Sequence, residues 1–90
     1  MEEIRWDLGK SAWLKRHRGT SFEEIIQTRL VGVKKHPTRA HQDIMLFEHK
    51  GYIWVVPFVV KGDEIFLKTL FPSRKYTRLY RKGQTGHEVI

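Results

Sequence analysis

The stretch TLFPSRKYTRLYRKG, residues 69–83, combines cationic and aromatic side chains in a way that suits chemistry on a polyanion. An apolar run ends at Pro72, and Arg74, Lys75 and Arg78 follow it closely. Arginine binds phosphate oxygens through paired hydrogen bonds and keeps its charge, whereas lysine can also move a proton when its pKa is shifted. Cleavage of RNA by its own 2'-hydroxyl requires a proton acceptor, cations beside the crowded phosphorane and a proton donor for the leaving oxygen.

The same cations have a simpler interpretation as a solvated surface that keeps the protein soluble. Residues 65–87 hold six Lys and Arg and no Asp or Glu, and the whole chain has 17 Lys and Arg against 10 Asp and Glu, a formal charge of +7. Solubility does not require the interleaved Tyr76 and Tyr80. These rings either stack on splayed bases or pack the last segment onto a sheet. Polyanions are therefore the expected partners.

Other kinds of catalytic site have little support in the sequence. The five histidines include no pair at helical i, i+4 spacing, and the chain has no cysteine, so we expect no metal site and no cofactor. His36 is a candidate acid or base, although a surface-loop histidine before a proline turn is the better explanation. The adjacent carboxylates Glu23 and Glu24 fit the first turn of a helix rather than a catalytic pair.

Caps and hydrophobic periodicity predict the elements that must position these side chains. A short strand over residues 4–6 precedes a helix over 8–17, capped by Asp7 and ended by Gly19. The capping box of Ser21 and Glu24 begins a second helix, which we expect to reach about residue 30. A loop over 31–42 then leads to three apolar runs, IMLFEH, YIWVVPFVV and EIFLKTLF, joined by short glycine-containing turns as an antiparallel meander.

These elements predict an α+β fold in which two N-terminal helices pack on a small antiparallel sheet, followed by a short C-terminal helical segment. Ninety residues suit a single domain, 1–90. The sequence contains no apolar run of membrane-spanning length and does not begin like a secretory signal. We therefore expect a soluble, cytoplasmic protein that does not bind membranes.

Several motifs together resemble a known family. WD with Lys10, RGTSFEEI at 18–25, HP, VPFV and IFLKTLFPSRKYT at 65–77 occur in the order found in the BrnT-like toxins of bacterial type II toxin-antitoxin pairs. The resemblance covers about residues 4–80 and places Arg18 where better-known members have a histidine. That family is similar to the broader RelE-like group, which has a small antiparallel sheet with two N-terminal helices.

The resemblance implies the toxin of a toxin-antitoxin system, a metal-independent endoribonuclease that cleaves RNA and arrests growth. It also implies a cognate antitoxin, commonly of ribbon-helix-helix type, that neutralises the toxin in a hetero-oligomer. The catalytic candidates are Arg74, Lys75 and His36. The candidate substrate-binding residues are Lys10, Arg18, Lys68, Tyr76, Arg78 and Tyr80.

Two alternatives explain the same charges. A non-catalytic nucleic-acid-binding module would use them without any tuned proton transfer. A protein-interaction domain would use the basic face to dock an acidic partner.

Overall fold

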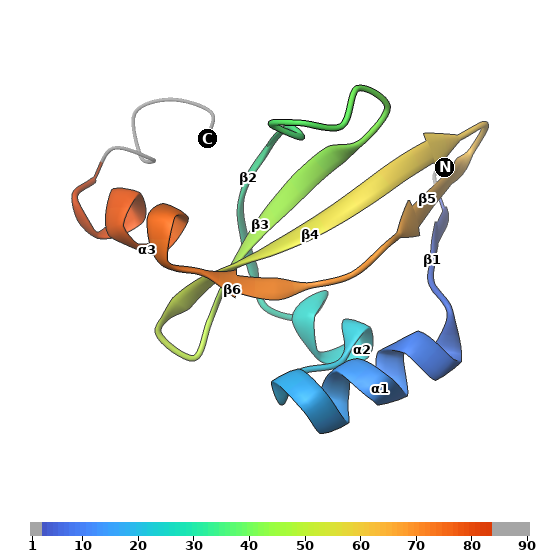
Figure 1. The fold of residues 1–90 in the computed structure, drawn as a ribbon, viewed down its shortest axis with the longest axis horizontal. Helices are drawn as coiled ribbons and strands as arrows, with labels where there is room; N and C mark the ends of the chain where they lie inside the picture. Colours follow the sequence, from blue (N-terminus) through green and yellow to red (C-terminus); the bar gives the residue numbers. More distant parts are fainter. Residues whose placement is uncertain (1–2, 84–90) are drawn as a thin grey trace.

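The computed structural model describes residues 3–83, which form six strands and three short helices (Figure 1). The strands are β1 (Glu3–Arg5), β2 (Arg29–Lys35), β3 (Asp43–His49), β4 (Tyr52–Lys61), β5 (Glu64–Leu67) and β6 (Phe71–Ser73). The helices are α1 (Leu8–Arg18), α2 (Phe22–Ile25) and α3 (Arg74–Arg81). No helix within the described range is both long and apolar enough to cross a membrane.

All six strands join one mixed sheet, in the order β1-β5-β4-β3-β2, with β6 pairing β4 separately. The pairs β2–β3, β3–β4, β4–β5 and β4–β6 are antiparallel, and β1 lies parallel to β5. The ten-residue strand β4 is central, because β3 pairs along one of its edges while β5 and β6 share the other edge. On that shared edge, β6 pairs with the first half of β4 and β5 with the second half. Pro57 lies between these two partners, so its missing N–H falls in a gap of the ladder.

The predicted helix caps are confirmed. Asp7 caps α1 by accepting a hydrogen bond from the Lys10 amide at 2.7 Å, and Gly19 ends the helix with a left-handed φ of 79°. Ser21 and Glu24 form the reciprocal capping box at the start of α2. These contacts are local, so residue type and spacing were sufficient to predict them.

The expected architecture, two N-terminal helices packed on a small antiparallel sheet, is wrong: the chain forms a six-stranded mixed sheet with three short helices. The second helix ends at Ile25 instead of about residue 30, and residues 29–35 form strand β2 instead of a helix end and a loop. Alternating valines at 31 and 33 favour a strand, and pairing with β3 outweighed the helical spacing that ended at Leu30. The parallel β1–β5 pair joins segments about 60 residues apart, which no local pattern predicts.

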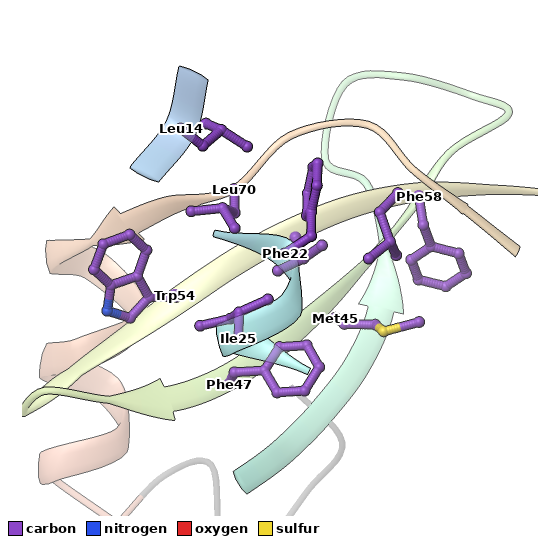
Figure 2. Close-up of a cluster of buried hydrophobic side chains, with 10 residues drawn as sticks. Leu14, Phe22, Ile25, Met45, Phe47, Trp54, Phe58 and Leu70 are labelled. Atoms are coloured by element: carbon purple, nitrogen blue, oxygen red, sulfur yellow. The ribbon is translucent and has the colours of Figure 1, made fainter. Parts of the chain in front are cut away.

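Side chains on the two faces of the sheet form two hydrophobic clusters, because successive strand residues point to opposite faces. The larger cluster joins α1 and α2 to the sheet (Figure 2) and consists of Leu14, Phe22, Ile25, Met45, Phe47, Trp54, Val56, Phe58, Leu67 and Leu70. The smaller cluster, on the other face, consists of Ile44, Leu46, Ile53, Val55 and Tyr76, with Leu79 and Tyr80 packed against it. The second cluster therefore fixes α3, which carries much of the basic stretch, against the sheet.

The predicted meander is confirmed by the antiparallel pairing of β3, β4 and β5. The β3–β4 connection is a two-residue turn in which Lys50 has φ 54° and Gly51 has φ 78°. Positive φ at both central residues is the type I' geometry, which matches the twist of paired strands. The turn places His49 directly opposite Tyr52.

Candidate nucleic-acid interface

Two open grooves meet at Tyr52 and Arg74, at the end of the sheet where the β3–β4 turn lies. One has a volume of about 500 Å³ and is lined by Tyr52, Arg74, Thr77, Arg78, Arg81 and Lys82. The other has a volume of about 480 Å³ and is lined by Arg18, Lys50, Tyr52, Trp54, Pro72 and Arg74. Because they share two residues, we treat them as one surface and call it the basic groove. A smaller adjoining pocket of about 250 Å³ contains Glu48, whose carboxylate accepts a hydrogen bond from the Tyr80 hydroxyl.

The basic groove has a large excess of positive charge. Its cations are Arg18, Lys50, Arg74, Arg78, Arg81 and Lys82, and its lining includes no carboxylate. The ion pairs found within residues 3–83 involve other cations: Arg5, Lys15, Arg29 and Lys35. Like charges held this close repel one another unless an anion lies between them. The groove is therefore suited to a polyanion.

Helix α3 is held to β4 by a buried hydroxyl. Thr77 Oγ1 donates to the Ser73 carbonyl at 2.6 Å and accepts from the Ile53 amide at 2.8 Å. Ser73 also caps the helix by accepting a hydrogen bond from the Tyr76 amide at 3.1 Å. With α3 fixed in this way, its arginines at i, i+4 and i+7, residues 74, 78 and 81, lie on one helical face and line the groove.

Two of the cations on α3 are unfavourable for the helix itself. Arg74 and Lys75 occupy its first turn, which contains no acidic residue. A cation near a helix N-terminus opposes the helix dipole and costs roughly 0.3 to 1 kcal/mol. Helix stability therefore does not explain these residues, and a bound anion would offset the cost.

The β3–β4 turn is held by cations from both sides and lies between α3 and the C-terminal end of α1 (Figure 1). Lys50, within the turn, donates from Nζ to the Gly19 carbonyl at 3.1 Å. From the other side, Arg81 Nη2 donates to the Gly51 carbonyl at 3.0 Å. Tyr52 follows the turn and remains 46% exposed at the centre of the groove. Its hydroxyl adds a neutral hydrogen-bonding group among the cations.

Arg18 joins the groove from the end of α1. Its Nη1 donates to the Leu70 carbonyl at 2.6 Å and to Thr69 Oγ1 at 3.2 Å, so it ties α1 to the segment that leads into β6. The guanidinium also lies 5.6 Å from the centre of the Trp13 ring. Arg18 therefore has a structural role in addition to lining the groove.

The structure thus brings together three of the predicted site residues, Arg18, Arg74 and Arg78, in the lining of the groove. Three other predicted cations do not line it. Lys10 lies over the Trp13 ring at 4.8 Å, Lys68 lies over the Phe66 ring at 5.7 Å, and Lys75 lies over the Tyr76 ring at 5.5 Å.

The two predicted tyrosines both have partners within the protein. Tyr76 is only 7% exposed and belongs to the smaller hydrophobic cluster. Tyr80 is half-buried, and its hydroxyl donates to Glu48 Oε1 at 3.2 Å. Both rings thus pack the last segment onto the sheet.

His36 lies far from the groove. Its Nδ1 accepts hydrogen bonds from the amides of Thr38 and Arg39, both at 3.1 Å, which keeps that nitrogen occupied within the β2–β3 loop. The loop precedes Asp43, whereas the groove lies beyond His49, at the other end of β3. Seven residues of strand separate the two ends by about 20 Å. The structure therefore does not bring His36 to the arginines.

The fold is similar to that of a protein of known structure. No protein-family model and no curated protein sequence matches this chain. The crystal structure of the Brucella abortus ribonuclease toxin BrnT is similar, with a TM-score of 0.55 and 20% sequence identity, over 81% of this chain and 97% of that one. The chain has the fold of BrnT. The resemblance to BrnT-like toxins inferred from the sequence motifs is confirmed at the level of the fold.

Four side chains of the groove that could contact a phosphate were not among the residues predicted from the sequence: Lys50, Tyr52, Arg81 and Lys82. The turn signal was available, because a lysine-glycine pair between two apolar runs predicts a tight hairpin with residue 52 at its end. Which end of the sheet faces α3 depends on the pairing of β6 with β4, a contact that local patterns do not encode. Within residues 3–83, no three His, Asp or Glu side chains lie close enough together to hold a metal ion.

Proposed function

We propose that residues 1–90 form a single toxin domain that binds RNA in the basic groove and cleaves it without a metal ion. The observation that carries the proposal is the convergence of six cations, without any carboxylate, around the exposed Tyr52. Further support comes from the fold, which is similar to that of the Brucella abortus ribonuclease toxin BrnT. The proposed partner is a cognate antitoxin of ribbon-helix-helix type that covers this groove in a hetero-oligomer.

In the proposed reaction, the 2'-oxygen attacks the adjacent phosphorus while its proton passes to a solvent water molecule. The bond to the 5'-oxygen breaks, and that oxygen takes up a proton from solvent. The products are a 2',3'-cyclic phosphate and a 5'-hydroxyl end. Arg74 is the main catalytic residue because it lines both halves of the groove and lacks a carboxylate partner among the described residues. Its guanidinium would stabilise the charge that develops on the phosphorane oxygens.

Three other groove residues complete the proposed site. Arg18 and Arg78 would hold neighbouring phosphates on either side of Arg74. The Tyr52 hydroxyl would donate a hydrogen bond to the leaving oxygen. We assign Lys75 a supporting role, since its ammonium lies over the Tyr76 ring rather than in the groove.

Incubation of the purified protein with end-labelled RNA tests the proposal. We expect cleavage to persist in excess EDTA and to leave 2',3'-cyclic phosphate ends. Tyr52→Phe should cleave more slowly than wild type, because it keeps the ring and loses only the hydroxyl. Loss of activity in EDTA that magnesium restores would refute the metal-independent mechanism. A small reading frame for a ribbon-helix-helix protein next to the gene would support the proposed partner.

One observation favours a second candidate, a nucleic-acid-binding module without catalysis. The groove lining contains neither a histidine nor a carboxylate, the side chains that most often act as general bases near neutral pH. Phosphate binding alone needs only the cations. The same incubation separates the two, because this candidate predicts a shifted RNA band and full-length product.

A further inference from the structure

A cluster of aromatic and cationic side chains lies on the exposed surface of α1. Trp13 is 37% exposed, and its ring stacks on that of His17 with 4.5 Å between centroids and 28° between planes. Lys10 Nζ lies 4.8 Å from the centre of the Trp13 ring, and the Arg18 guanidinium lies 5.6 Å from it. We call these four residues the Trp13 platform.

Trp13 is not part of the hydrophobic core. On α1 the core position is Leu14, which is fully buried, and Trp13 belongs to neither hydrophobic cluster. The indole N–H groups of Trp6 and Trp54 donate to Glu23 and to the His49 carbonyl, whereas Trp13 donates no hydrogen bond among the described residues. Trp6 and Trp54 therefore have hydrogen-bond partners within the protein, whereas the Trp13 ring remains at the surface.

The platform adjoins the basic groove through Arg18, which contacts the Trp13 ring and also lines the groove. A nucleic-acid strand whose phosphates occupy the groove would hold its bases within reach of neighbouring aromatic surfaces. The two tyrosines that the sequence suggested for stacking are engaged elsewhere, Tyr76 in the core and Tyr80 with Glu48. The exposed pair Trp13 and His17 offers the stacking surface that they do not.

We propose that the Trp13 platform binds a nucleobase of single-stranded RNA whose phosphates lie in the basic groove. The inference rests on the RNA binding of the proposed function but not on cleavage. An aromatic ring stacks on any base, and nearby cations strengthen the contact, so the platform would add affinity without strict sequence preference. Removal of one such ring should weaken binding about fivefold to a hundredfold.

The test compares two RNA oligomers of equal length, one with normal bases and one abasic, so that both carry the same phosphates. We expect Trp13→Ala to bind the normal oligomer at least about fivefold more weakly than wild type, with unchanged affinity for the abasic oligomer. Trp13→Phe, which keeps a ring, should recover most of the loss. Leu8→Ala is the matched control, because Leu8 is 74% exposed on the same helix and lies outside the platform. Thermal melting of each variant shows that the fold is intact.

The possible outcomes separate this inference from the proposed function. Equal affinity of wild type and Trp13→Ala for the normal oligomer would overturn the inference and leave Trp13 and His17 as an internal i, i+4 pair of the helix. An equal loss of affinity for both oligomers would also overturn it, because the effect would then not involve a base. Base-dependent binding without cleavage would support the platform and refute the ribonuclease. Failure of the wild-type protein to bind either oligomer would overturn both proposals.

Discussion

Arg74→Ala should slow cleavage strongly without destabilising the fold. The Arg74 side chain is exposed and makes no ion pair and no hydrogen bond among the described residues. Its charge opposes the dipole of α3, and its removal relieves roughly 0.3 to 1 kcal/mol of that repulsion. Ordinary surface substitutions change stability by about 0.5 kcal/mol in either direction. We therefore expect the free energy of unfolding of the variant to equal or slightly exceed that of wild type.

The effect on RNA should be large by comparison. Loss of one phosphate contact reduces the slope of log affinity against log salt by about 0.7 for a single strand. If the guanidinium stabilises the phosphorane, cleavage should also slow by about 100-fold to 1,000-fold, the usual effect of removing one such donor. The two quantities report binding and catalysis separately.

Urea denaturation, salt titration of RNA binding and timed cleavage of one labelled RNA measure these three effects. Arg39→Ala is the matched control, since Arg39 is an exposed arginine in the β2–β3 loop, at the other end of the sheet. The control should keep wild-type stability and cleavage. A destabilisation of Arg74→Ala by about 2 kcal/mol or more would show a structural arginine, and full activity of the variant would place the active site elsewhere.

Two further predictions concern the contacts that hold the site in place. Thr77→Val should destabilise the protein by about 1 to 3 kcal/mol and reduce cleavage, because it leaves the buried Ile53 amide without its acceptor. Thr77→Ser keeps the hydroxyl and should retain most of the stability and most of the cleavage. Equal denaturation midpoints for the two variants would contradict this prediction. The Lys15 ammonium and the Ser21 amide lower the pKa of Glu24 to about 2, below its ordinary value near 4.5, so its stabilising contribution is complete above about pH 5 and is lost as pH falls towards 2. In urea denaturation, Glu24→Gln should therefore lose less stability than wild type between pH 5 and pH 2. The difference should be small, because the Glu24 side chain is 42% exposed and solvent screens its charge. Equal losses of stability in the variant and the wild type over this pH range would contradict the prediction.

Features that depend on neighbouring residues could be predicted from the sequence alone. Asp7, Ser21 and Gly19 mark helix ends because each forms its capping contact within a few residues. The hairpin turns after His49 and Lys61 follow from glycine between apolar runs. The acid-free basic stretch likewise identified Arg74 and Arg78, which line the groove.

The way in which these parts combine depends on contacts between distant segments and is visible only in the folded protein. Strand β2 formed where a helix end and a loop were expected, because pairing with β3 supplies contacts that a helical pattern cannot show. The groove draws its side chains from the end of α1, the β3–β4 turn and α3, segments brought together by the β4–β6 pair and by the Thr77 contact to β4. Contacts between residues distant in sequence leave no periodic signal. For this reason, Tyr52 at the centre of the groove and His36 at the opposite end of β3 could be placed only by the fold.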